Sequence, residues 1–268
     1  MPKKAEFGPF ITVEREGPVA TVTLDRGDGR NAMSLEVLRD LKRVAESFSD
    51  DLKTQAVIVT GKGAFTAGAD LKDNALVERG RMGMLERRHA LRAGPDLCDA
   101  WERMEQVTIA AAETYCIGGG VALAVACDFR VMGVSTHLRL PEIPLGMNMS
   151  WHAIPRLVAL MGPAKTKKFV LFGEKLSASE ALAAGLVDDV TPDGQALAGA
   201  GEWARRIADL PPNAVRMTKQ SVNAVASAHH ASATFMDRDQ FALAATSEDY
   251  REAIAAFLEK RPPKFTGR

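Results

Sequence analysis

The stretch YCIGGGVALAVACDFR, residues 115–130, places three consecutive glycines directly before an apolar run. The run after Gly118, Gly119 and Gly120 carries no charged side chain until Asp128. Consecutive glycines at the start of a helix leave backbone N–H groups exposed, with the positive end of the helix behind them. Such a loop can cradle a phosphate, turn around a dinucleotide, polarise a carbonyl oxygen, or let a helix and a strand pack closely.

A second glycine-rich loop, GKGAFTAGADL at 61–71, follows a buried strand expected at 55–60. Neither loop has the Lys-Ser/Thr pair of a Walker phosphate loop, and the triplet lacks the G-x-G-x-x-G spacing of a dinucleotide turn. Close packing alone would explain one such loop. Two loops favour backbone N–H groups that converge on one carbonyl oxygen, where each donor contributes about 3 kcal/mol to a transition state. We therefore expect enolate chemistry on an acyl thioester.

The rest of the chain predicts an α/β fold with parallel strands, because strands, loops and helices alternate up to about residue 150. Helices dominate afterwards, and Pro211-Pro212 marks a C-terminal helical segment expected to pack on a neighbour. We divide the chain into a core domain, 1–205, and an oligomerisation segment, 206–268. The expected strands are two within 10–26, then 55–60, 107–114, 129–132 and 186–190, and the expected helices are 35–48 with Ser34 as N-cap, about 72–95, 151–161, 163–172, 177–184, 195–209, 213–226 and 232–258.

Composition excludes several classes of protein. Among 268 residues, Lys plus Arg equals Asp plus Glu at 34 each, which argues against binding to nucleic acids or membrane surfaces. Three cysteines without zinc-type spacing predict buried free thiols and no metal site. The N-terminus is not typical of a secretory signal, and the apolar window 117–127 is too short to span a bilayer. We expect a cytoplasmic protein.

Five motifs in the right order resemble the crotonase superfamily of enoyl-CoA hydratases and isomerases, over nearly the whole chain. Two are the glycine loops, AFTAGADL (64–71) and YCIGGGVALAVACDFRV (115–131). The third is LPEIPLG (140–146). RNAMSLEVL (30–38) is similar to the family's early CoA-binding turn, and AFLEKRPPKF (256–265) to its C-terminal tail.

The resemblance implies a ββα spiral core with a C-terminal helical trimerisation region, assembled as a homotrimer or a dimer of trimers. It implies an oxyanion hole made by the backbone N–H groups of Ala69 and Gly119. Coenzyme A would arrive as part of the thioester substrate, and no cofactor would be bound permanently. Asp70 directly follows Ala69, and the alternative to a role in CoA binding is that its side chain braces the loop. The residues that the resemblance implies at the CoA site are Gly29, Arg30, Ala67, Asp70, Phe257 and Lys260, the last two offered by a neighbouring subunit.

One expected acid is missing. Hydratases of the family carry two glutamates, one two residues after the glycine triplet and one in the P-E-I stretch. The second is present as Glu142, whereas the first position holds Ala122. Hydration needs one group to activate water and another to deliver a proton, whereas a single base can move a proton between carbons. We therefore expect an enoyl-CoA isomerase that shifts a β,γ double bond to the α,β position, with Glu142 as its base.

Two alternatives stay open at this point. A hydratase would need another side chain or a held water in place of the missing carboxyl. A non-catalytic, CoA-binding member of the family would keep the hole without the chemistry. The balanced charge gives nucleic-acid binding little support.

The acyl pocket is expected to depart from the family pattern after Gly146. Met147, Asn148 and Trp151 follow where the family has small residues, and with Ala122 they are expected to line the pocket. Core packing is the alternative for the methionines and the tryptophan. Among other polar residues, His152 is either a helix-start residue or a catalyst, and Asp128 and Arg130 are expected to form a structural pair. The run Arg87–His89 is expected to form a solvated helix face. Thr114 stands at a position where the family commonly has glycine.

Overall fold

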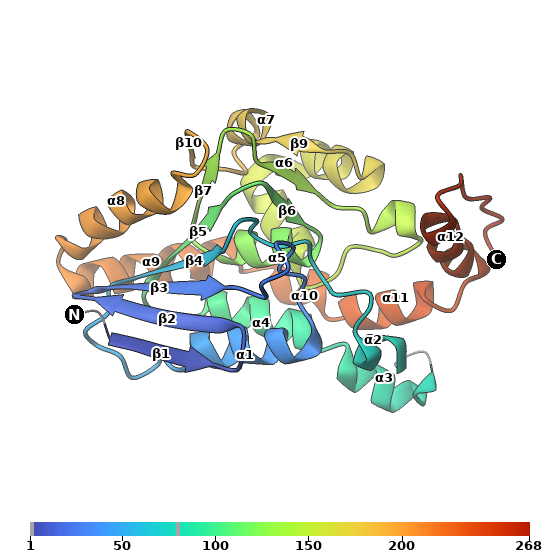
Figure 1. The fold of residues 1–268 in the computed structure, drawn as a ribbon, viewed down its shortest axis with the longest axis horizontal. Coiled ribbons are helices and arrows are strands. Elements are labelled where there is room, and N and C mark those ends of the chain that lie inside the picture. The colour runs from blue at the N-terminus through green and yellow to red at the C-terminus, as the bar shows by residue number, and fades with distance from the viewer. Residues whose placement is uncertain (1–2, 79–80) are drawn as a thin grey trace.

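The computed structural model describes residues 3–78 and 81–268 (Figure 1). A seven-stranded sheet with the order β1-β2-β3-β4-β5-β7-β10 forms the core, and a three-stranded sheet with the order β6-β8-β9 lies beside it. Within the large sheet, β3, β4, β5, β7 and β10 run parallel, whereas β2 is antiparallel to both of its neighbours, β1 and β3. The strands are β1 Lys3–Phe7, β2 Ile11–Glu16, β3 Val19–Leu24, β4 Ala56–Gly61, β5 Val107–Ala112, β6 Tyr115–Ile117, β7 Phe129–Gly133, β8 His137–Arg139, β9 Leu176–Ser177 and β10 Asp189–Thr191.

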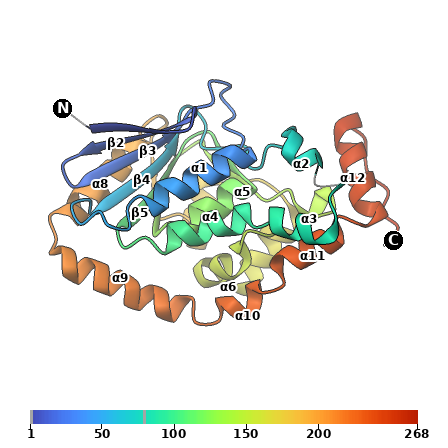
Figure 2. The ribbon, with the colours of Figure 1, turned by 90° about the horizontal axis from the view of Figure 1, so that it is seen from below.

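Helices cover both faces of the large sheet and continue past it toward the C-terminus (Figures 1 and 2). A short 3-10 helix, η2, spans Ile143–Leu145. The helices are α1 Leu35–Glu46, α2 Asn74–Glu78, α3 Met84–Ala90, α4 Ala93–Glu102, α5 Gly119–Ala126, α6 Ala153–Phe172, α7 Ala178–Ala184, α8 Ala196–Ala208, α9 Pro212–Ala226, α10 His230–Thr234, α11 Asp237–Ala244 and α12 Glu248–Glu259.

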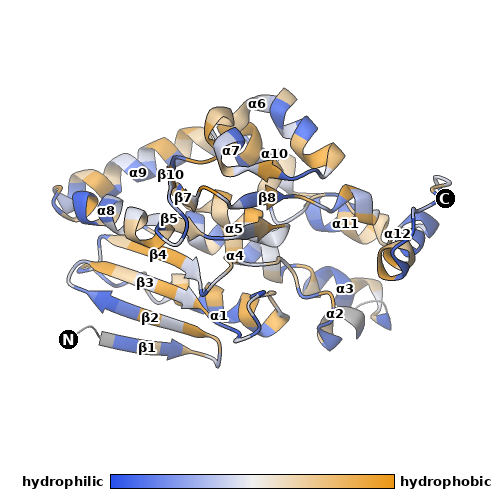
Figure 3. Ribbon diagram, turned by 45° about the horizontal axis from the view of Figure 1, so that its top comes forward, coloured by the Kyte–Doolittle hydropathy of each residue, from blue (hydrophilic) through white to orange (hydrophobic). Residues whose placement is uncertain are grey.

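The central strands are buried on both faces because alternate side chains enter two separate cores. On β4, Val57 and Val59 join the larger core, whereas Ala56 and Ile58 join the smaller one. The smaller core is closed by α8, whose alanines allow that helix to lie close to the sheet. Runs without polar alternation are typical of parallel strands covered on both sides. Figure 3 shows β3 and β4 as largely hydrophobic along their length.

The larger core lies under α1, α4 and α5. Ser34 caps α1 as expected, because its hydroxyl accepts a hydrogen bond from the Val37 N–H at 3.3 Å. The buried Trp101 of α4 donates its indole N–H to the Leu41 carbonyl on α1 at 3.1 Å. Every residue of α5 is buried, so the apolar run after the glycine triplet forms the centre of this core.

Several predicted elements are confirmed, and others are wrong in extent. The break expected between 161 and 163 is a kink within α6 at Gly162, where φ is 76°, just before Pro163. The helix expected at 232–258 is three helices, α10, α11 and α12, with Ser247 capping the last. The helix expected at 72–95 is divided among α2, α3 and α4, and residues 79–80 within it lie outside the described residues. The strands β1, β6, β8 and β9 were not expected.

Two local expectations need correction. The glycine triplet follows β6 of the small sheet, not β5 directly, because the chain turns at Thr114. Asp128 and Arg130 do not pair through their side chains. The Arg130 guanidinium pairs with the Asp188 carboxylate at 2.7 Å, and Asp128 pairs with Lys219 of α9, also at 2.7 Å.

The C-terminal segment packs on its own chain. Helices α9, α10 and α11 run along one side of the core, and α12 lies at the far end of the molecule from the N-terminus (Figures 1 and 2). A Cβ at Gly146, which ends η2, would lie 2.7 Å from the Tyr250 Cα of α12. Within the described part of the chain, no helix has both the length and the apolar character needed to cross a bilayer. The three cysteines are buried free thiols, as expected.

Candidate active site

The two glycine loops meet at one end of the sheet. The Ile117 N–H donates to the Thr66 carbonyl at 3.1 Å, and this contact joins the loop after β4 to β6. A Cβ at Gly68 would lie 2.6 Å from the Ile117 carbonyl oxygen and 3.4 Å from the Gly119 nitrogen. A side chain at position 68 would therefore separate the loops. Glycine lets them touch, and φ of +86° at Gly68 is also a conformation that suits glycine.

Hydrogen bonding around Ala69 indicates where its N–H group points. The Met33 N–H donates to the Gly68 carbonyl at 2.7 Å, and the Asp70 N–H donates to the Met33 carbonyl at 3.0 Å. In a parallel pair, a residue flanked by two such bonds turns its own N–H and C=O away from the partner strand. The Ala69 N–H therefore points away from Met33. Gly119 is the first residue of α5, where an N–H has no partner within its own helix.

Glu142 lies directly beside the second loop. A Cβ at Gly118 would be 2.8 Å from Glu142 Oε1, so the carboxyl group packs against the backbone that precedes Gly119. Glu142 immediately precedes η2, and its carbonyl accepts a hydrogen bond from the Met147 N–H at 2.9 Å. This turn holds the backbone at Glu142 in place.

The environment of Glu142 suits a general base. Its Oε2 atom is buried and has no hydrogen-bond partner among the described residues. Burial raises the pKa of the Glu142 carboxyl from its ordinary value of 4.5 to about 7, and the charge of Arg139 opposes this only in part. A carboxyl group that titrates near neutral pH can both accept and return a proton there.

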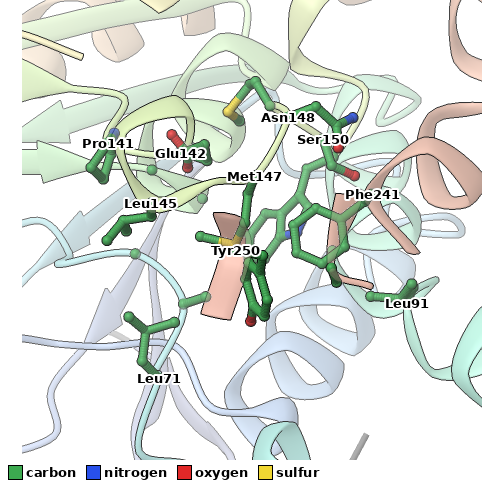
Figure 4. A pocket seen from close by; sticks show the side chains of 18 of the residues that line it. Leu71, Leu91, Pro141, Glu142, Leu145, Met147, Asn148, Ser150, Phe241 and Tyr250 are labelled. Atoms are coloured by element: carbon green, nitrogen blue, oxygen red, sulfur yellow. The ribbon is translucent and has the colours of Figure 1, made fainter. Parts of the chain in front are cut away.

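Ala69, Gly119 and Glu142 all line one pocket of about 460 Å³, shown in Figure 4. Its wall is mainly apolar, and Glu142 provides the one carboxyl group among its described lining residues. Ala67, Met147, Asn148 and Trp151 line it as expected. The remaining lining residues are Leu38, Gly68, Leu71, Arg87, Leu91, Gly94, Ile117, Gly118, Pro141, Leu145, Met149, Ser150, Phe241, Ala242, Ala245, Tyr250 and Arg251.

The indole of Trp151 packs directly on the backbone of two helices. A Cβ at Gly119 of α5 would lie 2.4 Å from an indole ring carbon, and one at Gly94 of α4 would lie 2.2 Å from another. Only glycine at both positions leaves room for the ring. Trp151 and His152 have φ values of 62° and 56°, a left-handed conformation that costs each non-glycine residue about 1–3 kcal/mol.

A polar network holds this turn in place. The Ser150 hydroxyl donates to the Asp237 carboxylate of α11 at 2.6 Å, and the His152 N–H lies 3.4 Å from the same oxygen. His152 Nδ1 is 2.9 Å from Asp99, which also pairs with the buried Arg156 at 3.0 Å. The strained backbone at Trp151 is thus fixed from both sides. His152 is the N-cap residue of α6, which supports the helix-start reading of this residue.

Ala122 does not line the pocket, in contrast to our expectation. It is fully buried in α5, three residues after Gly119 and on the same helix face. The indole of Trp151 covers that face at Gly119. The ring thus packs one turn before Ala122, the position where the resemblance implies a first glutamate in hydratases.

Four of the six residues expected to bind coenzyme A lie in or beside the glycine loop at 61–71: Gly29, Arg30, Ala67 and Asp70. The other two, Phe257 and Lys260, lie at the end of α12. The Ala67 N–H donates to the Arg30 carbonyl at 2.9 Å, so these two segments adjoin. Gly29 has φ of 67°, and Arg30 is exposed. Asp70 accepts from Arg26 at 2.7 Å, which supports the bracing role. In α12, Phe257 is exposed and Lys260 ends the helix, and the pocket does not include either of them.

Sequence reasoning missed one whole side of the pocket. Phe241, Tyr250 and Arg251 come from α11 and α12 of the same chain. Leu91 and Gly94 come from the segment around α4. No motif marks these positions, because they are far apart in sequence and most of them are apolar or small. Within residues 3–78 and 81–268, no three His, Cys, Asp or Glu side chains form a group that could hold a metal ion.

An α/β fold with two touching glycine loops and a buried carboxyl beside them defines a class of enzyme that polarises a carbonyl group and moves protons next to it. The family model described as enoyl-CoA hydratase/isomerase matches residues 14–268. The chain therefore belongs to the enoyl-CoA hydratase/isomerase family, within the crotonase superfamily.

Individual relatives match over nearly their full length. The chain is 34% identical to a probable enoyl-CoA hydratase from Mycobacterium bovis, over 96% of this chain and 98% of the relative. It is 33% identical to a 2,3-dehydroadipyl-CoA hydratase from Escherichia coli, over 96% and 99%. A solved enoyl-CoA hydratase/isomerase from Pseudoalteromonas atlantica superposes with a TM-score of 0.85 at 28% identity, over 96% of this chain and 100% of the other chain.

Proposed function

We propose that the chain is an enoyl-CoA isomerase that moves a β,γ double bond of an acyl-CoA thioester into the α,β position with Glu142 as its base. The observation that carries this proposal is that the described residues of the pocket include a single buried carboxyl group, that of Glu142, adjacent to Gly118. The second carboxyl position holds Ala122, which lies outside the pocket. A pocket with one such carboxyl group supports a reaction that transfers one proton and adds no water.

The steps follow from the placement of these groups. The thioester oxygen accepts hydrogen bonds from the N–H groups of Ala69 and Gly119. Glu142 removes a proton from the α-carbon, and the electrons of that C–H bond form a dienolate whose negative oxygen these N–H groups stabilise. The double bond shifts toward the thioester as Glu142 returns the same proton to the γ-carbon. The carboxylate is thereby regenerated and no other reactant is consumed.

The pKa of about 7 for Glu142 supports both halves of this cycle. A base with a much lower pKa would remove the proton poorly, and one with a much higher pKa would be protonated before the reaction at neutral pH. Apolar side chains around the carboxyl exclude bulk water, which strengthens its interaction with the developing charge.

Hydration of an α,β-enoyl-CoA is the second candidate, and the names of the relatives favour it. The relatives from Mycobacterium bovis and Escherichia coli are both called hydratases. A hydratase with this pocket would need a water held by Asn148 or Ser150, which are polar residues of its wall. Asn148 Oδ1 is buried without a hydrogen-bond partner in the described structure, so it could accept from such a water.

The purified chain should be assayed with a 3-enoyl-CoA and with a 2-enoyl-CoA of the same length, with products separated chromatographically. The proposal expects conversion of the 3-enoyl substrate to the 2-enoyl product without a 3-hydroxyacyl product. Glu142→Gln should lower turnover by about 10²- to 10⁴-fold. Dominant hydration, together with unchanged turnover in Glu142→Gln, would refute it. Tight CoA binding without turnover of either thioester would favour a non-catalytic member of the family.

A further inference from the structure

Trp151 forms the wall of the pocket next to Gly119. Its ring carbons occupy the space that a Cβ at Gly119 would fill, and Gly119 also lines the pocket. An acyl group whose thioester oxygen lies at the Gly119 N–H would therefore lie close to the indole. The tryptophan is in position to contact the acyl group close to its reacting carbons.

The other large side chains of the pocket make this region suited to a flat group. Phe241 and Tyr250 line the pocket from α11 and α12, and Figure 4 shows their rings beside Met147. Aromatic rings interact with one another in preferred offset or edge-to-face geometries, and methionine sulfur contacts ring edges favourably. A flexible or puckered alkyl group can fill the same space but gains none of these oriented contacts.

The indole is also held rigidly. The backbone at Gly94 and Gly119 limits its movement, and the left-handed turn at Trp151 is anchored to α11 through Ser150 and Asp237 at 2.6 Å. A ring that is already ordered loses little conformational freedom when a ligand stacks on it. A planar ligand therefore gains the full benefit of contact with this wall.

We propose that Trp151 determines the acyl specificity of the pocket, and that the preferred thioesters carry an aromatic or otherwise planar, conjugated group beyond the reacting carbons. The proposal rests on the proposed function for the reaction that follows, but the binding preference holds whichever reaction the enzyme catalyses. Trp151 thus takes a positive role in recognition, in addition to filling the core.

A matched pair of saturated thioesters tests the preference without any turnover. 5-Phenylpentanoyl-CoA and 5-cyclohexylpentanoyl-CoA share a carbon skeleton and differ in the planarity of the ring. Titration calorimetry with the full chain is expected to give about fivefold tighter binding of the phenyl thioester. Trp151→Leu should reduce this ratio to near one, mainly by weakening the phenyl ligand.

Trp203→Leu is the matched control. Trp203 packs on Phe129 and its indole N–H contacts Asp189 on the α8 side of the sheet, away from the pocket, so the ratio should stay as in the wild type. Equal binding of the two thioesters by the wild type would overturn the proposal, as would an unchanged ratio in Trp151→Leu. Because the wild-type ratio is measured without any variant, a ratio near one overturns the proposal even where Trp151→Leu fails to fold.

A turnover experiment separates this inference from the proposed function. The wild type is incubated with 5-phenyl-3-pentenoyl-CoA and 5-cyclohexyl-3-pentenoyl-CoA, and the 2-enoyl products are quantified. Selective binding without isomerisation contradicts the proposed function and leaves the specificity inference standing. Isomerisation of both thioesters at equal kcat/KM, with equal affinities, supports the function and overturns the inference.

Discussion

Replacing Glu142 with glutamine is expected to remove a pH dependence of the protein's stability. Burial raises the pKa of this carboxyl from 4.5 to about 7, so the folded protein keeps a proton that the unfolded chain releases at lower pH. The folded state binds more protons in this range, and the free energy of unfolding therefore falls as the pH rises from about 4.5 to about 7. The full loss is about 3 kcal/mol, of which about 2.5 kcal/mol falls between pH 5 and pH 8.

Urea unfolding followed by circular dichroism, at fixed protein concentration, measures this difference. Glutamine has nearly the shape of the protonated glutamic acid and does not titrate. Subtracting the variant from the wild type cancels the other titrating groups and any constant packing difference. The difference should change by about 2.5 kcal/mol between pH 5 and pH 8, with the variant favoured at the higher pH. Two curves that stay parallel over this range would refute the assigned environment of Glu142.

Three further predictions concern catalysis, packing and backbone strain. The kcat/KM for isomerisation should rise about tenfold per pH unit below about pH 7 and level off above it, because Glu142 must be ionised to accept a proton, and a flat profile would contradict its role as base. Gly94→Ala should lower the free energy of unfolding by about 1–3 kcal/mol, because its Cβ meets the Trp151 ring at 2.2 Å, and Trp151→Leu in the same chain should restore most of the loss. Gly201→Ala, whose Cβ would lie 3.5 Å from the end of a flexible arginine, should have little effect in the same melts. Thr114→Gly should raise stability by about 1 kcal/mol, because Thr114 has φ of 65°, and a lowered melting temperature would contradict this reading.

The parts of the site that sequence could predict are those that local chemistry dictates. Glycine loops after buried strands, and the carboxyl of Glu142 among apolar neighbours, can be read from a few adjacent residues. Ser34 as N-cap of α1 follows from the same kind of local pattern, and the structure confirms it. The family pattern also predicts the backbone conformation at Thr114, which adopts a glycine-like φ of 65° at a position where the family commonly has glycine.

The parts that sequence could not predict depend on contacts between distant segments. Phe241 and Tyr250 reach the pocket because α11 and α12 pack beside it, and apart from Ser247 before α12 no capping residue in the Ala-rich sequence of 232–258 marks the breaks between helices. The sequence predicts Trp151 in the pocket, but it could not predict that the indole packs against Gly94, because the two residues are 57 positions apart. Strands as short as β6, β8 and β9 carry too few residues for a recognisable period.

The position of Trp151 gives the protein a built-in optical reporter. The chain has three tryptophans, and Trp101 and Trp203 lie in packed environments away from the pocket. Conservative replacement of those two by phenylalanine would leave a single fluorophore at the acyl wall. Its emission wavelength and quenching would then follow the arrival and departure of a thioester in real time, without any attached dye.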